Sequence, residues 1–214
     1  VLGGVTSFMD MPNNNPPATS NDAIEHKLKI AEKDSYANYS FYLGATNDNL
    51  NEILAVDKKR ICGVKVFMGS STGNMLVDND IALEEIFAKS PVLVATHCED
   101  EATIKANLQY YKELYTGKEI PFSAHPLIRS REACIKSTSK AIELAKRFGT
   151  RLHILHISTA EEIKMITDTI SDGYKNITGE ICVHYLYFNS KDYEKMGSKI
   201  KCNPAIKDEP DMLA

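Results

Sequence analysis

The feature that most constrains the fold is a regular alternation of short apolar runs, rich in β-forming residues, with longer segments of helical periodicity. The expected strands are 4–11, 39–45, 61–68, 91–99, 151–158 and 179–188. The expected helices are 20–35, 79–90, 129–149 and 159–173. Several strand runs are apolar on both faces, as parallel strands covered by helices are. The pattern therefore predicts six βα units with parallel strands.

Polar side chains lie where these strands end and their loops begin, at Asn13, Lys65, His97 and His156. An α/β chain of this kind forms either a doubly wound sheet or a (β/α)8 barrel. In a barrel, the carboxyl ends of the strands surround one active site, so this placement favours the barrel. Six units are six-eighths of such a barrel, and residues 1–214 would then form one barrel domain that is incomplete at both ends.

Lys65 lies inside an apolar strand, "GVKVFM", which runs into a small-residue loop over 69–73. Removing an ammonium ion from water costs several kcal/mol unless the charge is paired or neutralised. One explanation is a lysine whose ammonium group reaches a nearby carboxylate. The other is a neutral amine that adds carbon dioxide, because burial lowers the pKa of lysine. The resulting carbamate is a carboxylate on a long stem and could bridge two cations.

His97 and His156 end two different strands, in "LVATHCED" and "HILHIS". A single histidine in such a position is usually a hydrogen-bonded structural residue. Two of them beside an equivalent lysine favour metal binding, since imidazole is a common ligand of zinc-type metals. The other four histidines are His26 on a polar helix face, His153 on the opposite strand face, His125 in a loop before proline, and His184, which stays ambiguous near the end of the sixth run.

Two asparagines lie in turn-forming segments. They are Asn13 in "MPNNNPP" and Asn203 in "KCNPAIK". These segments are also typical of tight connections without any binding role. An amide that projects into a pocket offers both donors and an acceptor, which suits a cyclic amide or a carboxylate. Asn13 and Asn203 are therefore candidate substrate-binding residues.

Composition excludes several classes of function. The net charge of −4 gives no electrostatic support for binding nucleic acid, and no apolar run approaches the ~18 residues that span a bilayer. The five cysteines form no C-x-x-C pair and are odd in number, which favours reduced thiols in the cytoplasm. The chain begins on valine and ends in a pattern typical of a helix start, so we expect a segment of something longer.

Together these segments resemble the cyclic amidohydrolases, and among them the dihydroorotases of pyrimidine biosynthesis. "GVKVFM" resembles the strand with the carboxylated lysine, and "ATHCED" and "ILHIS" resemble the strands with the next two histidine ligands. "MPNNNPP" is similar to the M-P-N-T-x-P signature, and "CNPAIK" to N-P-P-L-R. The resemblance runs from one end of the chain to the other, with the motifs in the expected order.

The resemblance implies a TIM-barrel hydrolase with two zinc ions bridged by carboxylated Lys65. One zinc would also take His97 and His156, while Asn13 and Asn203 would bind the substrate. The implied reaction is the reversible hydrolysis of the cyclic amide of dihydroorotate to N-carbamoyl-aspartate by a metal-bound hydroxide. A small molecule is thus the expected partner, and self-association into a homo-oligomer stays open.

The family's first-strand His-x-His-x-Arg motif and its eighth-strand aspartate, the general base, have no match here. The chain therefore resembles strands two to seven, and we expect it to be inactive alone. "VHYL" also replaces the commoner P-H-H-L at His184. The alternatives are a hydantoinase, dihydropyrimidinase or allantoinase, which share the lysine and histidines, or a non-catalytic barrel subunit. Both asparagines favour dihydroorotase over the related enzymes.

Overall fold

A computed structural model describes residues 1–69 and 74–214 and divides the chain into two compact units. The first unit comprises residues 1–96 and 144–152, and the second comprises 97–143 and 153–214. The strands hydrogen-bond in the order β1-β2-β3-β4-β5-β6, so each strand neighbours the next one in the chain. This is the order of a barrel wall, because a doubly wound sheet reverses its order at a switch point. Most of the small-residue loop expected over 69–73 lies outside the described residues.

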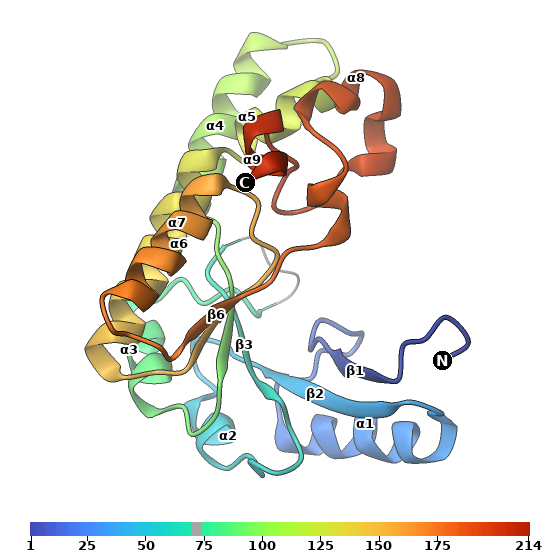
Figure 1. The fold of residues 1–214 in the computed structure, drawn as a ribbon, viewed down its shortest axis with the longest axis vertical. Helices are drawn as coiled ribbons and strands as arrows, with labels where there is room; N and C mark the ends of the chain where they lie inside the picture. Colours follow the sequence, from blue (N-terminus) through green and yellow to red (C-terminus); the bar gives the residue numbers. More distant parts are fainter. Residues whose placement is uncertain (70–73) are drawn as a thin grey trace. The chain divides into compact units, whose positions relative to one another are not determined.

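The first unit is built from alternating strands and helices. Its elements are β1 (Ser7–Asp10), α1 (Asn21–Asp34), β2 (Asn38–Gly44), α2 (Leu50–Leu54), β3 (Gly63–Phe67), α3 (Asp80–Lys89), β4 (Val94–His97) as far as Thr96, the end of α6 (Arg131–Phe148) and the first residue of β5 (Leu152–Ile154). β2 pairs in parallel with both β1 and β3. Figure 1 shows α1 running beside β2, and its buried face is formed by Ile24, Leu28 and Ala31. Ser20 caps the start of α1 by accepting a hydrogen bond from the backbone N–H of Ala23.

Every residue of β3 is buried, which makes it the central strand of this unit. β2 lies on one side of it, and on the other side the N–H of Val64 donates to the carbonyl of Leu93 over 2.8 Å. A Cβ atom at Gly63 would lie 2.7 Å from that carbonyl oxygen, so this close approach requires glycine. The strand that carries Lys65 is therefore shielded from water along its whole length.

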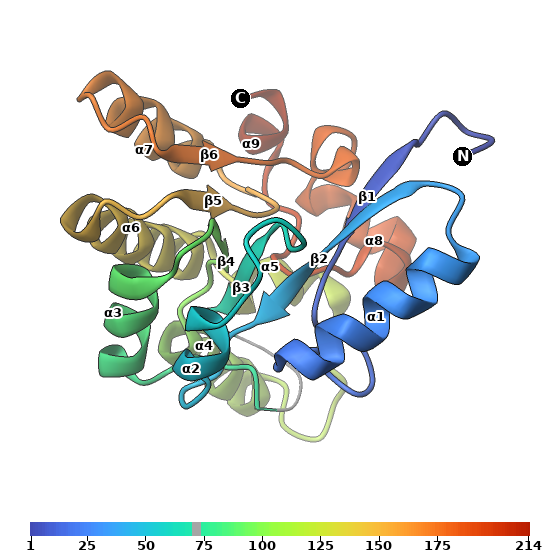
Figure 2. The same cartoon turned by 90° about the horizontal axis from the view of Figure 1, so that it is seen from below.

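The second unit combines helices with the remaining strands. Its elements are α4 (Glu101–Leu114), α5 (His125–Ile128), α6 as far as Glu143, the end of β5, α7 (Ala160–Ser171), β6 (Ile177–Gly179), α8 (Tyr193–Met196), α9 (Glu209–Leu213) and 3-10 turns at Phe122–Ala124, Val183–Leu186, Ser190–Asp192 and Gly197–Ile200. Figure 2 shows α7 lying alongside β6. The N–H of Glu180 donates to the carbonyl of Ile154 over 2.9 Å, which joins β6 to β5.

The start of α7 contains half of a capping box. Thr159 is the N-cap and accepts a hydrogen bond from the N–H of Glu162. The Glu162 carboxylate does not return to the N–H of Thr159. It is buried and accepts instead from the hydroxyls of Thr159 and Thr138 and from the N–H of Ser158. Glu162 thereby fixes the loop that follows β5 to α6.

The predicted sixth strand, 179–188, is wrong over most of its length. β6 ends at Gly179, and Val183–Leu186 form a 3-10 turn. The apolar residues of this run pack into a separate cluster, in which Tyr185 contacts Tyr193 and Ile206 and donates its hydroxyl proton to the carbonyl of Pro204. The apolar residues of this run therefore stabilise a packed turn. Hydrophobic periodicity alone does not distinguish such a turn from a strand.

Two further differences concern helices. The sequence pattern did not indicate α4, because its apolar stripe is thin and Ile104 is its only fully buried residue. The loop expected around His125 is instead the start of α5, and the His125 ring is buried with its Nε2 atom 2.8 Å from the carbonyl oxygen of Cys202. None of the helices in the described part of the chain is long and apolar enough to cross a membrane.

Asp211 attaches the last helix to the rest of the second unit. Its carboxylate accepts two hydrogen bonds from Arg131, at 2.7 and 2.5 Å, and one from the N–H of Ala160 at the start of α7. Burial raises the pKa of Asp211, but the hydrogen bonds from Arg131 and Ala160 outweigh burial and lower it. A carboxylate with a lowered folded-state pKa adds stability above its unfolded pKa and loses it as pH falls through the folded value.

We therefore expect Asp211→Asn to lower the free energy of unfolding at pH 7 by about 1–3 kcal/mol. The difference from the wild type should shrink as the pH falls below the ordinary pKa of an unfolded aspartate, about 3.9, and through the lowered folded-state pKa of Asp211. Urea unfolding followed by circular dichroism between pH 7 and pH 3 measures this. Asp208→Asn is the control, since Asp208 is largely exposed and asparagine also caps helices. A difference that stays constant with pH would contradict the assignment.

Candidate metal centre

The second unit brings His97 and His156 together. His97 ends β4 and is buried, and His156 follows β5 and is half-buried. The Nδ1 atom of His97 lies 3.0 Å from the Nε2 atom of His156. The ring centroids are 4.8 Å apart and the ring planes meet at 75°. The two histidines predicted from the strand ends therefore converge on one point through one nitrogen each.

The backbone of His156 is held in the left-handed region, with φ at 42°. It is the one non-glycine residue with positive φ among residues 1–69 and 74–214. This conformation costs a residue with a Cβ atom about 1 kcal/mol or more, and such strain is concentrated at functional sites. β5 ends at Ile154, two residues before His156. The left-handed backbone therefore lies in the loop after the strand, where the His156 ring approaches His97.

Glu99 and Arg129 stand behind His97. The Nε2 atom of His97 lies 2.8 Å from Oε2 of Glu99, whose side chain is completely buried. Arg129, which is also buried, donates from Nε to Oε1 over 3.1 Å and from an η nitrogen to Oε2. Burial raises the pKa of Glu99, but the hydrogen bond and charge of His97 and the charge of Arg129 lower it to about 2. Glu99 is therefore ionised, and its carboxylate lies against two basic side chains, those of His97 and Arg129.

The two histidine nitrogens fit a zinc-type metal. Two nitrogen ligands at about 2.0–2.1 Å from a tetrahedral ion are about 3.3 Å apart, close to the 3.0 Å between His97 Nδ1 and His156 Nε2. The Glu99 carboxylate lies 2.8 Å from the far nitrogen of His97, the position in which carboxylates commonly stand behind ligating imidazoles. Within the described residues, no three His, Cys, Asp or Glu side chains form a complete metal site. The pair is thus a partial site, and any further ligand is of another kind or comes from elsewhere.

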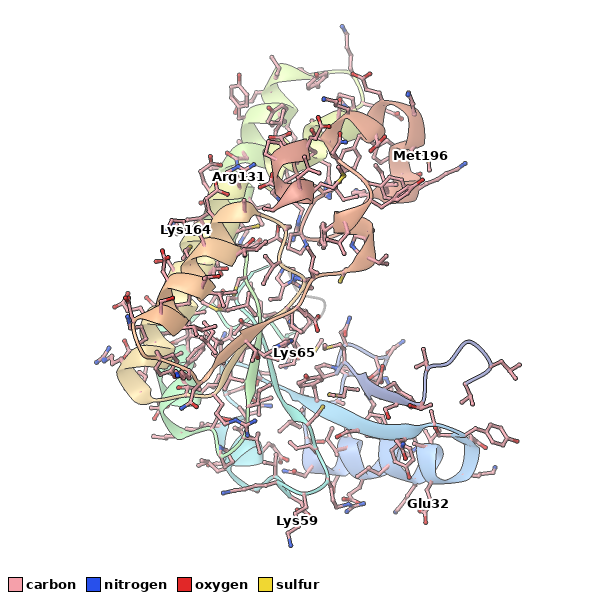
Figure 3. The ribbon with its side chains drawn as sticks, viewed as in Figure 1. Glu32, Lys59, Lys65, Arg131, Lys164 and Met196 are labelled. Atoms are coloured by element: carbon pink, nitrogen blue, oxygen red, sulfur yellow. The ribbon has the colours of Figure 1, made fainter. Side chains whose placement is uncertain are left out.

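Lys65 lies in the first unit, in the middle of β3 (Figure 3). It is 2% exposed, and its Nζ atom lies 4.1 Å from the centre of the Phe67 ring. The buried position predicted from "GVKVFM" is confirmed. The histidines belong to the second unit, so their convergence with Lys65, and its carboxylation, stay predictions.

Both asparagines are exposed, and each lies in a different unit. Asn13 is exposed in the first unit, in the segment after β1. Asn203 is exposed in the second unit, where it lines a cavity of about 330 Å³ together with Lys201, Arg129 and His125. The remaining wall of this cavity is apolar and consists of Ile104, Leu108, Ile120, Pro121, Phe122 and Ile128. The substrate-binding roles of both asparagines therefore stay predictions.

The four histidines set aside in the sequence analysis lie apart from the pair. His26 is exposed on α1, and His153 contacts Thr178 and Glu180. His184 lies in the 3-10 turn with its ring against Tyr185, so it does not end a strand. Burial lowers the pKa of both His125 and His184, which favours their neutral forms.

Sequence reasoning missed Glu99 and Arg129. Glu99 stands two residues after His97 in "THCED" and could have been noticed as a carboxylate beside a candidate ligand. Arg129 is 30 residues further along and carries no local signal. Its pairing with Glu99 depends on how α5 packs, which the sequence does not state.

Comparisons with known proteins show similarity over nearly the whole chain. The dihydroorotase of Methanosphaera stadtmanae is 28% identical over 211 residues, which are 96% of this chain and 46% of that protein. The allantoinase of Enterococcus faecalis is 31% identical over 222 residues, 99% of this chain and 48% of that protein. No protein-family model matches the chain.

Among solved structures, the L-hydantoinase of Arthrobacter aurescens superposes with a TM-score of 0.91 at 26% identity, covering 99% of this chain and 47% of that one. The dihydroorotase of Campylobacter jejuni shares the fold, with a TM-score of 0.66 at 18% identity, over 97% of this chain and 56% of that one. The predicted fold class is confirmed: the chain forms part of a TIM-barrel amidohydrolase fold. It spans about half the length of the curated relatives it matches, and the cyclic amidohydrolases are the family that fits it.

Proposed function

We propose that this chain is the central part of a metal-dependent cyclic amidohydrolase, and that the complete protein interconverts dihydroorotate and N-carbamoyl-aspartate. The observation that carries the proposal is the paired approach of His97 and His156, with Glu99 behind His97. Relatives with the names dihydroorotase and allantoinase match nearly the whole chain and support the cyclic-amide chemistry.

The residues of the chain would share the work as follows. His97 and His156 present ring nitrogens to the same point, and the Glu99 carboxylate lies beside the other ring nitrogen of His97. Lys65 is the candidate for the bridging carbamate. Zinc, when bound, would supply a hydroxide near neutral pH and polarise the amide carbonyl. The buried surroundings of His97 and Glu99 keep water from competing for their hydrogen bonds.

Dihydroorotate is preferred among the candidate substrates because it carries a carboxylate beside its ring. In the second unit, the cavity beside Asn203 offers the amide of that residue, the ammonium group of Lys201 and an apolar wall. Such a cavity suits a carboxylate attached to a compact ring. Hydantoin and allantoin are cyclic amides without that carboxylate, and the enzymes that act on them are the second candidate function.

Initial rates of the complete, zinc-loaded protein with dihydroorotate, allantoin and hydantoin test the proposal. We expect kcat/KM for dihydroorotate to exceed the other two by at least about 100-fold, because a site built around polar contacts rejects substrates that leave them unpaired. Turnover of allantoin or hydantoin without dihydroorotate would assign the protein to the second candidate. No turnover of any of them would favour a non-catalytic subunit.

The asparagines give a finer prediction. Asn13→Ala and Asn203→Ala should each remove a hydrogen bond to the substrate and lower kcat/KM for dihydroorotate by roughly 5- to 150-fold, the equivalent of about 1–3 kcal/mol. Steady-state kinetics measures this, with Asn176→Ala as the control, since Asn176 is exposed next to β6. Unchanged kinetics in the Asn203 variant would remove it from the substrate site.

A further inference from the structure

We propose that three buried side chains, those of His125, Tyr185 and Tyr193, are positioning residues for Asn203. They bind the backbone on both sides of Asn203 and thereby fix the direction in which its amide points. This inference rests on the proposed function, because it concerns how a candidate substrate-binding residue is prepared. All four residues lie in the second unit.

Asn203 is an exposed residue in a segment that is otherwise largely buried. The four residues that follow it, 204–207, are buried, and Cys202 before it is half-buried. Residues 201–208 of the described structure lie outside every helix and strand, so their backbone groups have no regular partners. Buried N–H and C=O groups need hydrogen bonds. Side chains from other parts of the unit supply them here.

The carbonyl groups on either side of Asn203 each accept a hydrogen bond from a buried side chain. Nε2 of His125 lies 2.8 Å from the carbonyl oxygen of Cys202, and it is the donor because a carbonyl can only accept. The Tyr185 hydroxyl donates to the carbonyl of Pro204 over 2.7 Å. The backbone is thus held at the residue before Asn203 and at the residue after it.

Two further contacts hold the rest of the segment. The N–H of Ile206 donates to the hydroxyl of Tyr193 over 3.1 Å, and Nζ of Lys207 donates to the carbonyl of Ala205 over 2.8 Å. The rings of Tyr193 and His125 also meet edge to face, with centroids 6.0 Å apart. His125 begins α5 and Tyr193 begins α8 (Figure 1). The segment is therefore tied to two helices.

This held backbone brings Asn203 to the wall of the cavity of about 330 Å³, which Lys201 also lines. Ordering a loop or a side chain on binding lowers affinity, and a group fixed in advance avoids this cost. Within the described part of the chain, Tyr185 and Tyr193 are not among the residues that line this cavity. The two tyrosines therefore act on a substrate there through Asn203 and not by contact.

A buried hydroxyl that donates to a carbonyl can also serve stability alone, and Thr150 in the first unit is a matched case. Thr150 is buried, and its hydroxyl donates to the carbonyl of Phe87 over 2.7 Å. Tyr185→Phe and Thr150→Val each remove one such hydroxyl and keep the remaining shape of the side chain. Both should cost similar stability, but only Tyr185→Phe should affect Asn203.

The first test is a double-mutant cycle in the complete, zinc-loaded protein, with steady-state kinetics on dihydroorotate. If Tyr185 acts through Asn203, the effects of Tyr185→Phe and Asn203→Ala are not independent. We expect Tyr185→Phe to lower kcat/KM by roughly 3- to 10-fold in the wild type, and by less than about 2-fold when Asn203 is already alanine. Thr150→Val should leave kcat/KM unchanged in both backgrounds.

The second test needs neither metal nor turnover. ¹⁵N relaxation of the protein labelled with ¹⁵N-asparagine gives the order parameter of the Asn203 backbone amide, whose signal is assigned by its loss in Asn203→Ala. We expect about 0.85 in the wild type and a fall toward about 0.6 in Tyr185→Phe and in His125→Leu. His125→Gln should restore rigidity, because the glutamine amide can donate to the same carbonyl. Thr150→Val should remain rigid at Asn203.

The positioning role is overturned if the two substitutions in the cycle lower kcat/KM by the product of their single effects. It is also overturned if the Asn203 amide stays rigid in the variants, or if Thr150→Val loosens it equally. Circular dichroism establishes folding, and if Tyr185→Phe does not fold, His125→Leu and His125→Gln carry the same comparison. Absence of dihydroorotate turnover by the wild type would instead overturn the proposed function, while the relaxation measurement still decides the positioning role.

Discussion

Replacing His97 or His156 by alanine in the complete protein is expected to remove the zinc ion held by this pair and to lower kcat/KM for the cyclic amide by at least roughly 10³-fold. The expected size follows from the role of the metal, since bound zinc strongly lowers the pKa of its water, to about 7. Without the ion, the attacking water is a much weaker nucleophile near neutral pH. Elemental analysis of the purified variants and their initial rates measure both effects.

The control for these variants is His26→Ala, because His26 is an exposed histidine on α1. It should retain the metal content and rates of the wild type. A His156→Ala variant that keeps its zinc and its activity would show that the 3.0 Å contact between the rings is an ordinary structural hydrogen bond.

Lys65→Met should have two effects of opposite sign. Methionine is similar in length and apolar, so it removes the cost of burying an amine in β3, where Lys65 is 2% exposed. In the absence of metal, we expect the free energy of unfolding to rise by about 1–3 kcal/mol. In the complete protein with zinc, activity should fall by at least about 100-fold, because the candidate bridging group is gone.

Urea unfolding of the metal-free protein and steady-state kinetics of the loaded protein measure these effects. The control is Lys59→Met, which replaces an exposed lysine (Figure 3 labels both positions) and should change neither quantity. A destabilised Lys65→Met variant with normal activity would show that Lys65 is held by a structural ion pair, the other explanation weighed from the sequence.

Local composition was enough to predict most of the strands and the positions of three polar residues on or just after them. The positions of Lys65, His97 and His156 were recognisable because each polar residue follows or interrupts an apolar run, and such runs are governed by burial. The order of the strands followed from the alternation of strands with helices. These features depend on local composition, so one sequence is enough to find them.

Prediction failed where the outcome depends on distant packing. The run at 179–188 is apolar enough for a strand, but Tyr185 packs against Tyr193 and Ile206 instead. The pairing of Arg129 with Glu99 joins residues 30 positions apart and is decided by the placement of α5. The left-handed backbone of His156 has no sequence signal either, because most histidines do not adopt this conformation and the residue type alone does not indicate it.

The use of both ring nitrogens by His97 has a consequence for redesigning this centre to hold another metal. Cysteine and aspartate also bind transition metals, but each offers an anion and no N–H. Placed at position 97, either one would face the negative charge of Glu99 and leave it with Arg129 alone. Exchange of the ligand at this position must therefore be made together with a neutral residue at 99 and a matching change at 129. Position 97 is one member of a three-residue cassette that has to be swapped as a whole.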